Sequence, residues 1–211
     1  MKIGVIGATG KAGQKIVVEA QTRGHEVTAI VRNASKVTED VQIIEKDIFD
    51  VTTADIENFE VVVSAFGTAA GEEHLFIETG AHLIKIFGDI DTRLIIVGGA
   101  GSLFVDEEKT TRLYDTADFP ALFYPTASSQ GQNLISLQAS DINWTFISPA
   151  INFDAEGKRT GSYTKGRDHV IVNRTGESYI SYADYAIAVV DEAEQAAHRN
   201  ERFTVVAEKE Q

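Results

Sequence analysis

The sequence predicts an α/β fold: a doubly wound parallel sheet with a small inserted lobe, carrying a hairpin, toward the C-terminus. Three observations support this fold. Short apolar runs alternate with helical patterns, a glycine-rich turn joins the first run to the first helix, and one late glycine-rich stretch interrupts the alternation. Strands covered by helices on both faces are apolar throughout, as these runs are. All 211 residues are predicted to form one domain, with 152–179 as the lobe.

Seven segments are predicted to be strands because they are short, rich in β-branched residues and mostly apolar. They are Lys2–Ile6, Glu26–Val31, Gln42–Glu45, Glu60–Ser64, Arg93–Val97, Asn143–Ser148 and Arg202–Val206. Right-handed crossovers between such strands give the doubly wound arrangement.

Four helices are predicted between the strands from apolar residues that recur every three or four positions. They cover Lys11–Arg23, Glu72–Phe87, Thr126–Ser140 and Ser181–Ala196. Gly24 and Gly88 follow the first two, as is typical of helix ends. The last helix opens with Ser181 and Asp184 at the spacing of a capping box.

Residues 152–179 break the alternation of strands and helices. Four glycines surround two strand-like runs, Gly161–Thr164 and Val170–Val172, which predict a hairpin. Ligands of doubly wound sheets bind beyond the carboxyl ends of the strands, so this lobe would cover the substrate side. A surface excursion without function is the alternative.

The turn after the first strand predicts a dinucleotide site. It reads Gly7-Ala8-Thr9-Gly10-Lys11-Ala12-Gly13. Glycine lets the backbone turn tightly and approach a ligand closely, and the N-terminus of the following helix favours an anion such as a pyrophosphate. The cofactor-binding residues expected in this turn are Gly7, Thr9, Gly10, Lys11 and Ala12.

The end of the second strand favours NADP(H) over NAD(H). NAD-binding folds of this kind usually have Asp or Glu there, which accepts hydrogen bonds from the ribose hydroxyls. This chain has Arg32, whose planar guanidinium suits a 2′-phosphate, and Lys11 would add a second positive charge. The alternative is that Arg32 is a solvated residue at a strand end.

Further cofactor-binding residues are expected after the later strands, at the same edge of the sheet. They are Asp47, Ile48, Ala65, Phe66, Gly67, Gly98 and Gly99. Asp47 would hold the adenine edge, and the small residues around Phe66 would let the backbone pass the ribose. Each segment also has the composition of a simple turn.

Composition excludes several classes of function. The net charge of −13 would repel polyanions, so neither nucleic acid nor an anionic membrane is an expected partner. The chain has no cysteine, which excludes disulfides and thiol nucleophiles, and its 5 histidines show no ligand spacing, so no metal is expected. No long apolar segment or leader is apparent, which predicts a cytoplasmic protein. A homodimer is left open.

Five motifs carry a resemblance to a known family. They are Gly7–Gly13, Val31–Asn33, Val97–Leu103, Trp144–Ala150 and Ile180–Ala186. With them the chain resembles the NmrA-like, atypical short-chain dehydrogenase/reductases, a group of NAD(P)H-binding proteins and NADH-flavin reductases distantly similar to biliverdin-IXβ/flavin reductase. The resemblance implies an NADP-binding Rossmann domain in which the backbone of Pro149 and Ala150 holds the nicotinamide carboxamide.

The chain lacks the tyrosine–lysine pair that many short-chain dehydrogenases use for catalysis. Many short-chain dehydrogenases use Tyr-x-x-x-Lys, in which the lysine lowers the pKa of the tyrosine. Tyr124 is the best-placed tyrosine, but Ser128 stands where the lysine would be, so alcohol oxidation by this pair is not expected. Hydride transfer to a flavin needs mainly a nicotinamide stacked beside an aromatic surface.

We therefore predict an NADPH-dependent reductase of a flavin, quinone or similar planar acceptor. Ser102 is the predicted catalytic residue, because its hydroxyl would orient a carbonyl or relay a proton. The aromatic surface would come from Phe66, Phe104, Phe123, Tyr124 and Phe153. Two alternatives are a non-catalytic NADP-binding redox sensor, which the resemblance also allows, and an epimerase-like isomerase.

Overall fold

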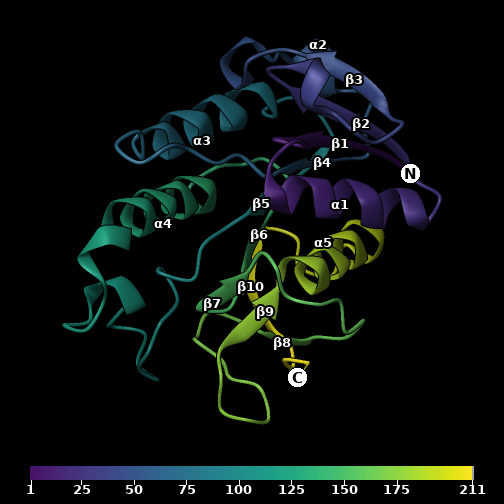
Figure 1. Ribbon diagram of the computed structural model, residues 1–211. Coiled ribbons are helices and arrows are strands. Elements are labelled where there is room, and N and C mark those ends of the chain that lie inside the picture. Colours follow the sequence, from purple (N-terminus) through teal and green to yellow (C-terminus); the bar gives the residue numbers. More distant parts are fainter. Residues whose placement is uncertain (211) are drawn as a thin grey trace.

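A single eight-stranded sheet forms the middle layer of the molecule (Figure 1). The computed structural model describes residues 1–210. In spatial order the strands are β3 (Gln42–Glu45), β2 (Glu26–Val31), β1 (Lys2–Ile6), β4 (Val61–Ser64), β5 (Arg93–Val97), β6 (Trp144–Ser148), β10 (Glu201–Val206) and β8 (Thr164–Gly166). Neighbouring strands are parallel except for β10 and β8. The predicted doubly wound α/β fold is confirmed, and each predicted strand is correct to within one residue.

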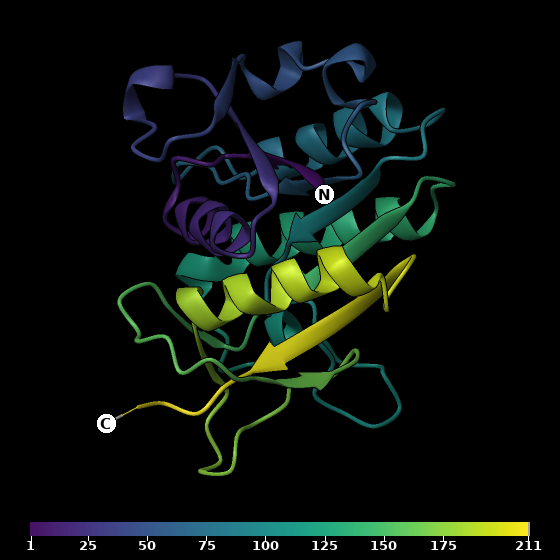
Figure 2. The same cartoon turned by 90° about the vertical axis from the view of Figure 1, so that its right-hand side faces the viewer.

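Helices cover both faces of the sheet. Helix α1 (Lys11–Thr22) packs beside α5 (Tyr182–Gln195) on one face, and α3 (Leu75–Ile86) packs beside α4 (Tyr124–Gln138) on the other, as Figure 2 shows. Successive strand residues point to opposite faces, so Val5 joins the apolar core under α1 and α5 while Ile6 joins the core under α3 and α4. The four predicted helices are confirmed to within three residues, and the short α2 (Thr53–Ile56) was not predicted.

The strand order fixes where a ligand would bind. The chain runs outward from β1 to β3, then returns to the other side of β1 and continues through β4, β5 and β6. Loops after β1 and β4 therefore leave the sheet in opposite directions and open a crevice at its carboxyl edge. The glycine-rich turn lies at this point.

The strand pairing predicted inside the lobe was wrong. Residues 164–166 form β8, which pairs with β10 of the main sheet, and Val170–Val172 is not a strand. The other lobe strands, β7 (Asn152–Asp154) and β9 (Tyr179–Ser181), pair with each other in parallel. β8 pairs with β10 because β10 would otherwise be an open edge of the sheet. Val170 is not available for a hairpin, because its backbone N–H donates to the Phe104 carbonyl at 3.0 Å.

The start of α5 uses its capping residues in two different ways. Ser181 is the N-cap, and its hydroxyl accepts a hydrogen bond from the Asp184 backbone N–H at 3.0 Å. The Asp184 carboxylate does not complete the predicted capping box. It accepts instead from the backbone N–H groups of Thr160 and Gly161 and from the Thr160 hydroxyl. This carboxylate therefore fastens the lobe to α5.

A buried ion pair joins the sheet to α5. Arg93 at the start of β5 lies 2.9 Å from the Glu192 carboxylate and also donates to the backbone carbonyls of Glu192 and Ala193. His198 contacts the second carboxylate oxygen at 2.7 Å. Burial lowers the pKa of Arg93, and the Glu192 carboxylate opposes this by favouring the charged guanidinium.

We expect Glu192→Met to destabilise the protein by about 3–5 kcal/mol, because it leaves the buried Arg93 guanidinium without a counter-charge. Urea unfolding followed by circular dichroism measures this loss. Glu208→Ala removes the partner of Arg174 in an exposed pair and should leave the unfolding midpoint nearly unchanged. Equal effects of the two substitutions would contradict the assignment of Arg93 and Glu192 as a stabilising pair.

Candidate functional site

The turn between β1 and α1 is built around close backbone contacts. Gly7 has a φ of +73°, and a β-carbon on it would lie 2.6 Å from the Ala65 carbonyl oxygen after β4. A β-carbon on Gly13 would lie 2.2 Å from the Gly7 carbonyl oxygen. Both positions require glycine for α1 to begin this close to the crevice. The first-turn N–H groups and the positive end of the α1 dipole therefore face that crevice.

A cleft of about 730 Å³ opens at this edge of the sheet. Fourteen of the predicted cofactor-binding residues line it together: Gly7, Thr9, Gly10, Lys11, Ala12, Arg32, Ile48, Ala65, Phe66, Gly67, Gly98, Gly99, Pro149 and Ala150. They come from the turns that follow six strands, β1 to β6, which explains how residues more than 140 positions apart in sequence meet. The volume is that of a typical small-molecule or cofactor site.

Two predicted site residues lie outside the cleft lining. The Asp47 carboxylate accepts a hydrogen bond from the Phe49 backbone N–H at 3.1 Å and caps a short 3₁₀ turn. Ser102 is buried, and its hydroxyl oxygen lies 3.1 Å from the Arg202 guanidinium, which donates to it. The expectation that Ser102 faces a nicotinamide or acceptor is therefore corrected, because this hydroxyl is held by the interior of the protein.

Positive charge gathers at the β2 and β3 end of the cleft. Arg32 and Lys36 are exposed, and within residues 1–210 neither is paired with a carboxylate. Lys46 also lines this end, where the Asp55 carboxylate holds its ammonium with both oxygens at 2.7 Å. Sequence reasoning missed both lysines, although their position just after β2 and at the end of β3 was a usable signal. Lys11 lies at the glycine turn, 3.6 Å from the exposed Glu156.

The opposite end, which we term the acceptor half, has a different lining. It consists of Val97, Gly98, Gly99, Ala100, Phe123, Thr126, Gln130, Pro149, Ala150, Ile151, Phe153 and Tyr182. None of these side chains is charged. Of the predicted aromatic surface, Phe66, Phe123 and Phe153 line the cleft, whereas Phe104 and Tyr124 do not.

Two aromatic rings wall the acceptor half on the lobe side. The Phe153 and Tyr182 ring centroids are 3.9 Å apart, and Phe153 also contacts the buried Tyr185 at 4.8 Å. Burial raises the pKa of Tyr182, so its phenol stays protonated and can donate a hydrogen bond. The Phe153 and Tyr182 rings are tilted by 41° to each other, and together they offer apolar surface against which a ring can pack.

Comparisons with known proteins agree with this geometry. A model of the NAD(P)H-binding family matches residues 7–206. The chain belongs to that family. A nicotinamide cofactor is therefore the class of cofactor that the family implies for this chain, and the resemblance to the NmrA-like, atypical short-chain dehydrogenase/reductases is confirmed.

Several known proteins are similar to this chain along almost its whole length. The uncharacterised protein YwnB of Bacillus subtilis (strain 168) is 66% identical over 213 residues, covering 100% of both chains. A crystal structure from Streptococcus pneumoniae TIGR4, called "a putative NADH-flavin reductase", has a TM-score of 0.95 and 44% identity, covering 99% of this chain and 100% of that one. One from Bacteroides thetaiotaomicron, called a "putative epimerase", has a TM-score of 0.85 and 33% identity, covering 100% and 98%.

The described residues contain neither a metal-binding cluster nor a membrane-spanning helix. Within residues 1–210, no group of three or more histidine or acidic side chains is arranged to hold a metal ion. None of the helices in that part of the chain has the length and apolar character needed to cross a membrane.

We expect Gly13→Ala to raise the dissociation constant of the dinucleotide about tenfold, because its β-carbon pushes α1 away from the Gly7 carbonyl. Titration calorimetry with NADP⁺ and NAD⁺ measures the change. Gly24→Ala is the matched control, since Gly24 has a φ of +80° but open space around its β-carbon position at the far end of α1. It should cost stability and leave cofactor affinity intact. Normal affinity in Gly13→Ala would contradict the role of this contact.

Proposed function

We propose that this protein is an NADPH-dependent reductase that transfers hydride to a flavin, quinone or similar planar acceptor. The observation that carries the proposal is the division of the cleft into a cationic end and an uncharged, aromatic acceptor half. The name of the Streptococcus pneumoniae structure, at 44% identity, supports flavin as an acceptor. The proposal places the protein in the cytoplasm and leaves a homodimer open.

The preference for NADPH is inferred from Arg32 and Lys36. Both side chains are exposed at the end of the cleft where the adenosine ribose of a dinucleotide lies in this fold, and neither is engaged by a carboxylate within residues 1–210. A 2′-phosphate would receive charge-assisted hydrogen bonds from the guanidinium. Local positive charge matters here because the net charge of −13 opposes an anionic cofactor elsewhere on the surface.

The acceptor half would position a ring and exclude water from it. Bound NADPH would supply the hydride. Phe123, Phe153 and Tyr182 supply apolar surface, and Tyr182 can donate a hydrogen bond because its phenol stays protonated. The proton that completes reduction of a flavin can come from solvent, so Ser102 is not needed for it.

Replacing Arg32 with alanine should weaken NADPH binding roughly 10- to 100-fold and leave NADH binding unchanged, because only NADPH carries the 2′-phosphate. Equilibrium titration of both coenzymes measures the ratio. Arg167→Ala is the control, since Arg167 is also exposed but does not line the cleft. An unchanged NADPH-to-NADH ratio in Arg32→Ala would refute the assignment.

The wild-type protein should oxidise NADPH in a saturable manner when riboflavin, FMN or a quinone is supplied, because the acceptor half fits a flat uncharged ring. Stopped-flow absorbance of the reduced nicotinamide, against a panel that also includes aldehydes, measures the rates. Tight coenzyme binding without turnover across the panel would favour the alternative of a redox sensor.

A further inference from the structure

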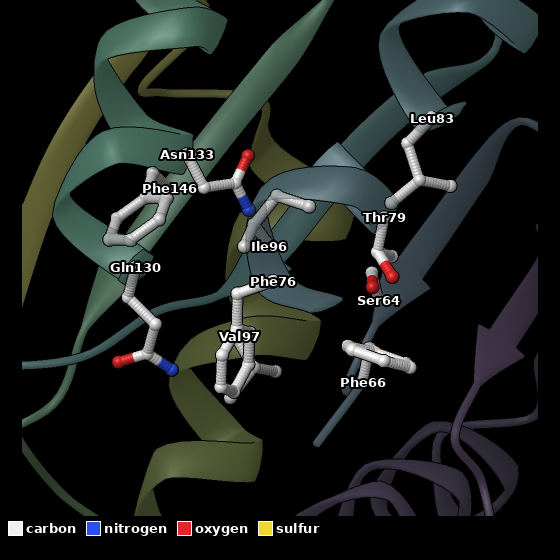
Figure 3. Close-up of a pocket in the computed structure, with 10 residues that line it drawn as sticks. All are labelled: Ser64, Phe66, Phe76, Thr79, Leu83, Ile96, Val97, Gln130, Asn133 and Phe146. Carbon is white, nitrogen blue, oxygen red and sulfur yellow. The ribbon is translucent and has the colours of Figure 1, made fainter. Parts of the chain in front are cut away.

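Gln130 occupies a distinctive place at the base of the acceptor half. It lies on α4, is half-buried, and lines both the large cleft and a small neighbouring cavity of about 10 Å³. Figure 3 shows its side chain extending from α4 toward Val97 at the end of β5. Within residues 1–210 its amide makes no hydrogen bond.

The Gln130 amide occupies space that is available only because residue 99 is a glycine. A β-carbon on Gly99 would lie 2.0 Å from the Gln130 Oε1 atom, so the amide lies across the bare backbone of Gly99. A β-carbon on Gly98 would likewise meet the Phe146 ring at 2.1 Å. The two glycines after β5 therefore make room for side chains of this protein. Gly99 thus leaves the space that the Gln130 amide occupies, in addition to any room it leaves for a cofactor.

The small cavity beside Gln130 contains polar groups without hydrogen-bond partners. Thr79 and Asn133, which line this cavity with Gln130, each have a buried oxygen atom that lacks a hydrogen-bond partner. The remaining lining is largely apolar, with Phe66, Phe76 and Leu83 among it (Figure 3). Within residues 1–210 no protein group is hydrogen-bonded to the Gln130 amide, so the amide can bond a ligand in the cleft.

Gln130 is also the one side chain of the acceptor half that presents a donor and an acceptor on separate atoms. The other polar side chains of that half are the hydroxyls of Thr126 and Tyr182. Thr126 lies one turn before Gln130 on the same face of α4. A primary amide can form two hydrogen bonds side by side with any ligand edge on which an N–H adjoins a carbonyl.

We propose that Gln130 binds the amide or imide edge of a ring held in the acceptor half, donating to its carbonyl and accepting from its N–H. This inference rests on the proposed function. Two rings carry such an edge: the carboxamide-bearing nicotinamide and the imide-bearing isoalloxazine of a flavin. A simple quinone has carbonyl groups without the adjoining N–H, so Gln130 would favour flavins over quinones.

Gln130→Leu tests the proposal, with Gln132→Leu as the matched control because Gln132 is exposed on the same helix. Three dissociation constants are measured by fluorescence. The first is for NADPH, and the second is for ADP-ribose 2′-phosphate, which lacks nicotinamide. The third is for riboflavin binding to the protein already saturated with NADP⁺. Loss of a buried hydrogen-bonded pair should weaken the affected ligand about tenfold.

The pattern of losses identifies the ring. Weaker NADPH binding in Gln130→Leu with unchanged binding of the ADP-ribose derivative assigns the nicotinamide, whereas weaker riboflavin binding with unchanged NADPH assigns the flavin imide. Affinities equal to those of Gln132→Leu for all three ligands would overturn the inference. The inference would also be overturned if the wild-type protein bound no riboflavin and Gln130→Leu bound NADPH with normal affinity.

Failure of the proposed function gives a different result. Wild-type protein that binds both rings yet transfers no hydride would refute the reductase and leave the role of Gln130 standing. If the wild-type protein reduces riboflavin and Gln130→Leu binds all three ligands normally, the reductase stands and the role of Gln130 is refuted. Menadione is a quinone without an N–H, so Gln130→Leu should slow its reduction only if Gln130 binds the nicotinamide.

Discussion

The close approach of α1 to the turn after β1 is the constraint on which the site depends. Gly7 and Gly13 have no room for a β-carbon, so the helix begins directly against the crevice between β1 and β4. The helix dipole and the free first-turn amides then face the point where the strand order reverses. Any residue larger than glycine at these positions would move the helix and open the base of the cleft.

From that point the cleft extends in two directions with opposite character. Toward β2 and β3 it is lined by Arg32, Lys36 and Lys46, and toward β5 and β6 by uncharged and aromatic side chains. The separation suits a ligand with an anionic end and an aromatic end, as a nicotinamide dinucleotide has. Charge in the chain as a whole is strongly negative, so the cations at one end of the cleft are a local departure from the average.

The lobe is held against the sheet by buried charged groups. Arg202 at the start of β10 donates to the Ser102 carbonyl and hydroxyl and to the Asp168 carboxylate. Although burial opposes it, hydrogen bonds from Lys109 and Arg202 lower the pKa of Asp168, which keeps this carboxylate charged. Ser102 thus belongs to the attachment of the lobe, whereas Gln130, on α4, lines the acceptor half.

The sequence by itself determined the strands, the main helices, the doubly wound class and most residues of the cleft, because apolar periodicity and glycine spacing are local properties of the chain. Only the tertiary structure decided the partner of β8, the burial of Ser102 and the placement of Gln130 over Gly99. Each of these depends on which distant segment packs alongside. The sequence pattern shows that Ser102 follows a strand, but the hydrogen-bond partner of its hydroxyl is Arg202, which lies 100 positions later in the chain.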